Sequence, residues 1–401
     1  QAWNDGGNWQ CGQVPNATTN AIIPTLSLRF PLIDAANAAV NNLTIQLGAS
    51  LTIEEYKLAI KGNINNTGII NASNAALEFN GTSAQVIPAN LVLLNKLKKL
   101  TINNTAGVTM QGPLEISDVL TIEKGSLSTG DMLTLKSDAN GTARIAPLPV
   151  DGNGVATAFI NGKVIIEKYL SMRKAWRMLT APVNAAGAPS INAAWQEGLT
   201  TASPVPNLFP GLGVHIIGGT VANGFDQALT STPTIKVYSN ATNNFVAIPG
   251  AGTNAPITNF PGYFIYTRGD RGINLLAGVS AAITETVLRV KGNVNTGNIT
   301  TAVNAANYTV LANPYASAID FATVTKHNVK NNFYIWDPKM SGTFGLGAYV
   351  AFSWNDGTGS YDATTSASGL TQYIPSGEAV FVESEDGLNP GTITIKESDK
   401  L

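Results

Sequence analysis

A short alternating tripeptide recurs through the first third of the chain. The sequence Leu-Thr-Ile stands at 43–45, 51–53, 100–102 and 120–122, and close variants stand at 58–60, 77–79 and 133–135. Apolar and polar residues alternate in each piece, which is the period of a strand with one buried face. Each piece is too short to bury that face alone, whereas stacked coils give all of them one continuous interior. The region from 40 to 135 therefore predicts a right-handed parallel β-helix, an all-β solenoid.

The chain has 401 residues, more than a single hydrophobic core usually supports, so several domains are expected. Trp3 and Trp9 are large aromatic residues suited to cover the open end of a first coil; the alternative is a platform that stacks on a sugar. We predict an N-terminal cap over 1–20, the parallel β-helix over 21–168, and a β-sandwich region in two halves, 169–290 and 291–401.

The sequence pattern changes in the second part of the chain, from about residue 169 onward. Short strands separated by long loops rich in Gly, Pro and Asn indicate a β-sandwich. One helix is predicted near 190–198, with Ser190 as its N-cap and Gly198 just past its end. Motifs then recur in the same order: Pro-terminated strands at 179–183 and 311–315, a helix-like stretch at 317–321, strands at 235–240 and 333–338, and Gly-containing strands at 260–266 and 375–382. This order predicts an internal duplication whose loops have drifted.

Composition excludes several classes of protein. Charged residues make up 12% of the chain and the net charge is −2, which argues against a nucleic-acid partner. The hydrophobic fraction of 44% argues against disorder, and no apolar run reaches the roughly 20 residues of a membrane span. The single cysteine, Cys11, excludes an intrachain disulfide and is expected to fill space in the cap.

Catalytic chemistry finds little support in the sequence. Parallel β-helices also occur as polysaccharide lyases and hydrolases, which need convergent acids or bases. Glu54 and Glu55 stand alone, and the other coil carboxylates are predicted to be scattered, solvated corner charges: Asp118, Glu123 and Asp131. His215 lies in an apolar run and is predicted to be a half-buried strand residue. Together with the distant His327, it forms no zinc or Ser-His-Asp pattern, so we predict no catalytic, cofactor-binding or metal-binding residue.

Two loop motifs remain. Oxygen-rich turns at 151–154 and 355–362 suit a structural calcium ion, although Asx turns use the same residues for backbone hydrogen bonds alone. The tripeptide Arg268-Gly-Asp270 invites an integrin-binding interpretation, but its position after a strand favours a plain turn.

Several motifs together resemble a known class of protein. They are Trp3-Asn4, Asn8-Trp9, Val14-Pro15, the Leu-Thr-Ile coils, and the segments at 173–183, 192–198, 262–270, 311–321 and 333–338. In this order they are similar to large secreted surface proteins of Bacteroidota, which are exported by the type IX secretion system. The resemblance implies an extracellular, surface-attached protein and carries no catalytic motif. Such proteins continue into a C-terminal sorting domain that is not found before Leu401, and the chain begins with Gln1 rather than Met. We therefore expect cleavage at export or a longer parent protein.

The sequence thus predicts a non-enzymatic extracellular structural or adhesive protein: a stalk, a surface-layer component or a filament subunit. Expected partners are further copies of the chain, other cell-surface proteins, a glycan, and the outer-membrane secretion machinery during export. The alternative is a carbohydrate-binding or polysaccharide-degrading β-helix protein, in which Trp195, Trp354 and Tyr361 are the candidate stacking residues.

Overall fold

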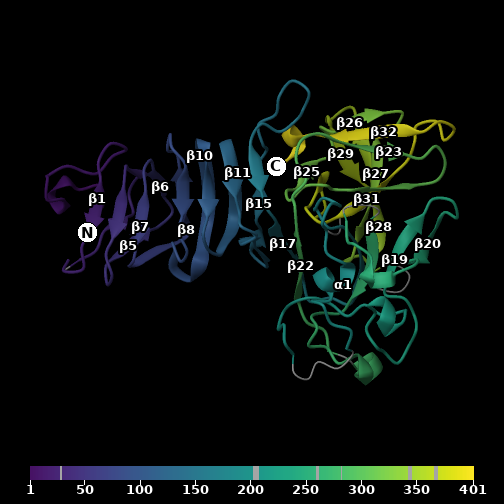
Figure 1. Cartoon of the computed structure of the whole chain (residues 1–401). Helices are drawn as coiled ribbons and strands as arrows, with labels where there is room; N and C mark the ends of the chain where they lie inside the picture. The colour runs from purple at the N-terminus through teal and green to yellow at the C-terminus, as the bar shows by residue number, and fades with distance from the viewer. Residues whose placement is uncertain (28, 202–206, 259–261, 281, 342–345, 365–368) are drawn as a thin grey trace. The chain divides into compact units, whose positions relative to one another are not determined.

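The structure is a computed structural model of residues 1–401, and it describes all of them except 28, 202–206, 259–261, 281, 342–345 and 365–368. Two compact units emerge (Figure 1). The first comprises 1–136 and 141–165, and the second comprises 137–140 and 166–401. The chain passes between them within β17 (Val164–Leu170), close to the predicted end of the β-helix at 168. Phe260 and Pro261, at the start of one predicted repeat motif, lie outside the described residues.

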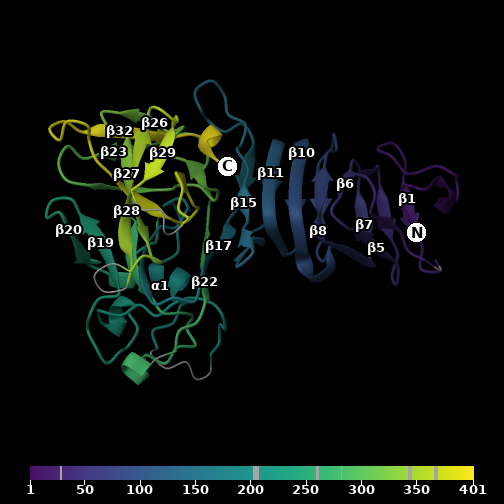
Figure 2. The same cartoon turned by 180° about the vertical axis from the view of Figure 1, so that it is seen from behind.

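The first unit is a parallel β-solenoid of about six turns, as predicted. Its successive coils appear as a row of strands in Figures 1 and 2. Among the described residues of this unit, strands of successive coils pair in parallel, including those of the Leu-Thr-Ile pieces. One column of strands contains β1 (Ala21–Ile23), β4 (Leu43–Ile45) and β7 (Ile64–Asn66). A second contains β2 (Leu32–Ile33), β5 (Ser50–Ile53) and the start of β8 (Ile69–Phe79). A third contains β3 (Ala38–Val40), β6 (Lys57–Ile60), the end of β8, β10 (Lys96–Met110) and β11 (Leu114–Ser128).

Shorter strands complete the coils. β9 (Gln85–Ile87) pairs with the end of β10, and three strands pair with β11: β12 (Leu133–Leu135), β15 (Arg144–Ile145) and β16 (Phe159–Asn161). Two further short strands are β13 (Ser137–Asp138) and β14 (Gly141–Thr142).

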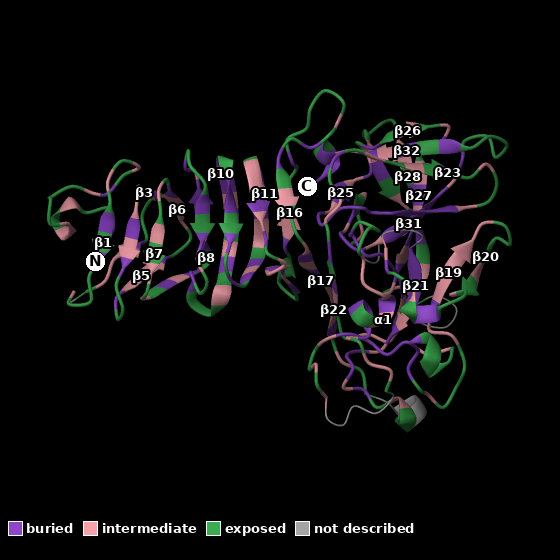
Figure 3. Cartoon of the chain, in the orientation of Figure 1, coloured by how far each residue is buried: buried purple, intermediate pink, exposed green. Residues whose placement is uncertain are grey.

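The solenoid core consists of the apolar residues of the repeated tripeptides. Leu58, Leu77, Leu100 and Leu120 follow one another across four coils and are completely buried. The alternation of buried and less buried positions along each strand is visible in Figure 3. Each coil therefore gains its hydrophobic stabilisation from the coils on either side of it.

The corners of the coils are held by side-chain hydrogen bonds from one turn to the next. The Asn20 Oδ1 atom accepts hydrogen bonds from Asn41 Nδ2 and Asn42 Nδ2 at 3.0 and 2.8 Å. Asn42 Oδ1 in turn accepts one from the Asn63 backbone N–H at 2.7 Å. The Asn-rich composition of this region thus satisfies backbone and side-chain groups where the strands end.

The N-terminal cap contains one buried and one half-buried tryptophan. Trp3 is completely buried, and the Trp9 ring stands edge-on to it at 4.8 Å, with Trp9 Nε1 donating a hydrogen bond to the Trp3 carbonyl. Both rings therefore act as cap packing. The prediction that Cys11 fills space in the cap is wrong, because its side chain is exposed in the turn that follows η1 (Gly6–Asn8).

In the described part of the second unit, three sheets have three or more strands each. The first has the order β18 (Ala175–Leu179), β21 (Tyr263–Thr267), β19 (Ile235–Ser239), β20 (Asn244–Ala247). The second has the order β24 (Thr309–Ala312), β31 (Ala379–Val382), β27 (Asn332–Asp337), β28 (Ala348–Asn355), β29 (Ser360–Ala363). The third has the order β23 (Ile299–Val303), β32 (Gly391–Ile395), β26 (Thr325–His327). β25 (Ile319–Asp320) pairs with β30 (Tyr373–Ile374), and β22 is Thr286–Gly292.

The first two sheets repeat one topology. In each sheet, a Pro-terminated strand lies at one edge and pairs antiparallel with the strand of that sheet that comes last in the sequence. The second sheet has one additional strand, β29, at its other edge. The equivalent pairs are β18 and β24, β21 and β31, β19 and β27, and β20 and β28. Equivalent positions for the two Pro-terminated strands are what the predicted duplication requires.

The second sheet, which contains β24 and β31, packs against apolar residues on both of its faces. Val310 and Phe381 point into a core shared with Met178 and Phe264 of the first sheet. Leu311 points the other way, into a second core that also contains residues of the third sheet, Val303, Ile393 and Ile395. The second unit is therefore layered sheet on sheet, with the duplicated sheets facing each other.

Helical structure is sparse. The predicted helix is α1 (Ile191–Trp195), and the Ser190 side chain caps it by accepting a hydrogen bond from the Ala193 N–H at 3.0 Å. The helix-like interpretation of 317–321 is wrong: Ile319 and Asp320 form β25, and Ser317 Oγ bonds to the Leu401 carbonyl instead. The other 3₁₀ turns are η2 (Leu93–Asn95), η3 (Val221–Asn223), η4 (Gly252–Asn254), η5 (Leu275–Ser280) and η6 (Glu397–Asp399).

Two buried tyrosines and one half-buried tyrosine of the second unit predict a loss of stability in alkali. Burial is the main factor that raises the pKa of Tyr334 to about 12 and the pKa of Tyr315 and Tyr361 further above their ordinary value near 10. Raised pKa values favour the folded state fully below pH 10, and this contribution is lost as the pH rises through 10 toward 12. We expect the free energy of unfolding to fall over this range, and urea titrations between pH 9 and 12, with tyrosinate absorbance, would measure it. An unchanged free energy would contradict this packing.

Candidate functional site

The three aromatic residues proposed for sugar stacking do not form an open platform. Trp195 and Tyr361 are buried, with 3% and 7% of their surfaces exposed, so their faces are not available to a ligand. Trp195 is instead on the inward face of α1 and packs edge-on against Tyr263 at 5.5 Å. Trp354 is half-buried and lies 5.2 Å from Tyr361, against the core.

The oxygen-rich loops use their oxygens for turns. Asp151 Oδ1 accepts hydrogen bonds from the backbone N–H groups of Asn153 and Val155, both at 2.9 Å. In the other loop, Asn355 Oδ1 accepts a hydrogen bond from the Gly357 N–H at 2.9 Å, and Asp362 Oδ2 accepts one from Asn355 Nδ2 at 2.6 Å. Within the described parts of the chain, no group of three or more His, Cys, Asp or Glu side chains is arranged to hold a metal ion. These hydrogen bonds match the Asx-turn interpretation of both loops.

The Arg-Gly-Asp tripeptide belongs to a buried turn. Asp270 is 8% exposed, and its carboxylate accepts hydrogen bonds from Gly211 N–H at 2.7 Å and Gly272 N–H at 3.0 Å. A carboxylate that organises its own loop in this way is not presented to a receptor.

The solenoid carboxylates lie mostly at corners. Asp118 is 3.4 Å from the Lys99 ammonium, and Asp131 Oδ1 accepts a hydrogen bond from the Lys163 N–H. Glu54 and Glu55 do not stand alone: stacking of the coils brings Asp34 to the same corner, where the three line a cavity of about 410 Å³. This grouping is invisible in the sequence, because Asp34 belongs to the preceding coil.

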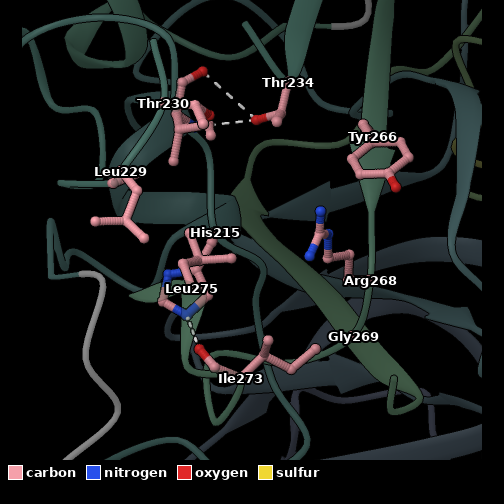
Figure 4. Close-up of a pocket in the computed structure, with 11 residues that line it drawn as sticks. His215, Leu229, Thr230, Thr234, Tyr266, Arg268, Gly269, Ile273 and Leu275 are labelled. Carbon is pink, nitrogen blue, oxygen red and sulfur yellow. Dashed lines mark hydrogen bonds between the residues drawn. The ribbon is translucent and has the colours of Figure 1, made fainter. Parts of the chain in front are cut away.

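An enclosed arrangement of polar side chains surrounds His215 (Figure 4). His327 is exposed on β26. A cavity of about 170 Å³ has apolar walls that include Leu229, Ile273 and Leu275. Tyr266 and Arg268, from the end of β21 and the residues after it, line the cavity near His215 in Figure 4. This cavity is suited to a small, largely apolar group.

A buried ion pair lies behind His215. The Arg271 guanidinium binds the Asp226 carboxylate in bidentate geometry, with Nη2–Oδ1 at 2.7 Å and Nη1–Oδ2 at 3.0 Å. Asp226 also accepts hydrogen bonds from Gln196 Nε2 at 3.1 Å and the Ile216 N–H at 2.8 Å. Both charged side chains are 2–3% exposed. The pair joins residues 45 positions apart in the sequence and fixes the loops around the cavity.

His215 is held in the cavity wall by a hydrogen bond of one ring nitrogen. Its Nε2 is 2.8 Å from the Ile273 carbonyl oxygen, which can only accept, so Nε2 carries the hydrogen. Its Nδ1 faces the Asp226 carboxylate at 3.6 Å. The hydrogen bond of Nε2 therefore links the loop that carries His215 to the loop that carries Ile273.

The environment of His215 differs from the one that the sequence predicts. The residue is buried, at 8% exposure, and lies in an extended segment outside the strands rather than in a half-buried strand. Asp226 and Arg271 were not predicted as its neighbours. No local motif marks either residue, and only the fold brings them together.

Comparison with known proteins gives one match. A family model described as a domain of unknown function, DUF8693, matches residues 1–85, which cover the N-terminal cap and the first coils. No curated protein and no solved structure matches the chain. In the described portion of the molecule, no helix combines the length and hydrophobicity needed to span a membrane.

Proposed function

We propose that this chain is a non-enzymatic extracellular protein with a structural or adhesive role at a cell surface. The observation that supports this proposal best is the uninterrupted apolar ladder of the solenoid, in which fully buried leucines follow one another from coil to coil. Six turns at the usual spacing of about 4.8 Å between paired strands make a stiff body about 30 Å long. A body of this kind serves as a spacer in a stalk, surface layer or filament.

The resemblance to type IX secretion substrates supports export across the outer membrane, and self-association or contact with other surface proteins follows from the same proposal. Cleavage of polysaccharide by the β-helix is the competing function. Its residues would have to include the corner carboxylates Asp34, Glu54 and Glu55, whose cavity is open and polar.

Labelling of intact source cells with an antibody against the chain tests the surface role. We expect labelling of intact cells, its loss in a strain without the type IX secretion system, and regular fibres or projecting stalks in electron micrographs. Labelling only after permeabilisation would contradict the surface role. Release of new reducing ends from any polysaccharide by the purified chain would contradict the non-enzymatic role.

A further inference from the structure

Two cavities of the second unit share one side chain, Trp336 near the end of β27. One has a volume of about 470 Å³ and a mainly aromatic lining, and the other has a volume of about 220 Å³ and a lining rich in charged residues. Adjacent residues of β18 also line them, Trp176 the first and Arg177 the second. We call the two together the Trp336 groove.

The aromatic part has aromatic side chains at the margin of the core, with the Lys236 ammonium over the Trp176 ring at 5.2 Å. Trp176 is stacked on Phe264 at 4.7 Å and 8°, and Phe264 is stacked on Phe245 at 4.5 Å and 20°. Trp176 and Phe245 are half-buried, and Tyr349 is 40% exposed. Partly exposed aromatic side chains that line a cavity are suited to a ligand with a flat apolar face.

The shared wall is rigid. Trp336 Nε1 donates a hydrogen bond of 2.8 Å to the Trp176 carbonyl, which fixes the indole. Gly347 lies directly against this ring, because a Cβ atom at that position would be 2.3 Å from Nε1. Its φ of +115° is also a conformation that favours glycine. A wall fixed in this way loses little freedom when a ligand binds.

The charged part contains a buried cation without a carboxylate partner. Arg177 is 8% exposed; its Nε donates to Thr267 Oγ1 at 3.0 Å, and its Nη2 donates to the Ser171 carbonyl at 3.1 Å. Among the described residues, Arg177 forms no close ion pair: the Glu378 carboxylate, itself paired with Lys168, favours its charge only from a greater distance, and Nη1 donates no hydrogen bond. Burial lowers the pKa of Arg177, a sign of how far it is desolvated. A ligand carboxylate would compensate this charge and use the bidentate geometry of the guanidinium.

A buried carboxylate oxygen lines the same cavity. Asp337 is 1% exposed; its Oδ1 accepts a hydrogen bond from the Lys339 N–H at 2.8 Å, but its Oδ2 has no partner in the described structure. Leaving a buried acceptor unsatisfied is costly, and a hydroxyl group is the simplest neutral donor that would satisfy it. Lys168 and Glu378, paired at 2.6 Å, neutralise each other at the same cavity.

We propose that the Trp336 groove binds a segment of an acidic polysaccharide. A run of uronic acid residues offers the features that the two cavities call for: a carboxylate for Arg177 and hydroxyl groups for Asp337 in one cavity, and an apolar ring face for the aromatic side chains of the other. This inference rests on the proposed adhesive function and gives it a ligand class. An acidic peptide would provide the charge but not the row of hydroxyl groups.

Calorimetric titration of the full chain with a tetra-uronate, and with the same oligosaccharide after reduction of its carboxyl groups, tests the proposal. We expect the acidic form to bind about tenfold more tightly than the neutral form, the loss expected for one charge-assisted pair. Tyr349→Ala is expected to weaken binding about fivefold through loss of a ring face. Tyr373→Ala is the matched control, because Tyr373 is 43% exposed and lines neither cavity. The affinity of the Tyr373→Ala variant for the tetra-uronate should stay unchanged.

Arg177→Gln should remove the preference for the acidic form. Since Arg177 is buried, its variant is compared only after circular dichroism shows native structure, and Asp337→Asn supplies a second test by weakening both forms equally. No binding at millimolar tetra-uronate, equal affinity for the neutral form, or equal competition by an oligoglutamate peptide would overturn the inference. Surface labelling of cells is independent of these titrations, so failure of the ligand and failure of the surface role are distinguishable.

Discussion

Replacement of Leu100 by alanine should destabilise the solenoid by about 3 kcal/mol, within the range of about 2–5 kcal/mol for buried leucines. Leu100 is completely buried between Leu77 of the preceding coil and Leu120 of the following coil. The lost side chain removes apolar contacts on both sides and leaves a cavity that a closely packed ladder fills poorly. Hydrogen–deuterium exchange of the β8, β10 and β11 amides would measure the effect locally.

Thr101→Ala is the control for this substitution. Thr101 is the next residue on the same strand and lies on the outward face, so its replacement should change stability by no more than about 0.5 kcal/mol. Equal effects of the two substitutions would contradict the assignment of inward and outward faces. An effect of Leu100→Ala confined to the second unit would contradict the solenoid itself.

Replacement of Arg271 by leucine should cost about 3–5 kcal/mol of stability, because it leaves the Asp226 carboxylate buried without its cation. Asp226 has no exposed surface on its side chain and cannot recover the lost interaction from water. Urea unfolding of the full chain, followed by tryptophan fluorescence, measures the loss.

Two further variants separate charge from packing. The double variant Asp226→Leu, Arg271→Leu should lose less than Arg271→Leu alone, since no unpaired charge remains. Arg289→Leu removes the partner of Glu197, but the Arg289 side chain is one-third exposed, and a loss of about 1 kcal/mol is expected. A double variant less stable than the single one would show that the pair stabilises the fold for reasons other than charge compensation.

The sequence was most informative where structure is set by short-range pattern. Alternation in the Leu-Thr-Ile pieces predicted parallel coils because the same three residues decide which face is buried in every turn. Ser190 predicted the start of α1 because an N-cap is a local interaction. The sequence also predicted the duplicated topology, because both copies retain a Pro-terminated edge strand.

Long-range contacts explain most of what the sequence did not reveal. Residues 317–321 have the composition of a short helix, but pairing of Ile319 with Ile374 overrides that local preference. The contact of His215 with Asp226 and Arg271, and the meeting of Trp176 with Trp336 across 160 positions, depend on how three sheets stack. Aromatic residues in a sequence give no sign of which ring remains partly exposed. Trp195 and Tyr361, the predicted stacking residues, are buried, whereas Trp176 is half-buried and Tyr349 is 40% exposed.

The asparagine-linked corners have a consequence for how the solenoid can evolve. Each turn forms its contacts with the turn before it and the turn after it, through leucines inside and amide side chains outside. Insertion or deletion of one entire turn therefore recreates the same junction on both sides and leaves distant turns undisturbed. A lineage could adjust the length of this body in steps of one turn, about 5 Å each, without redesigning anything at either end.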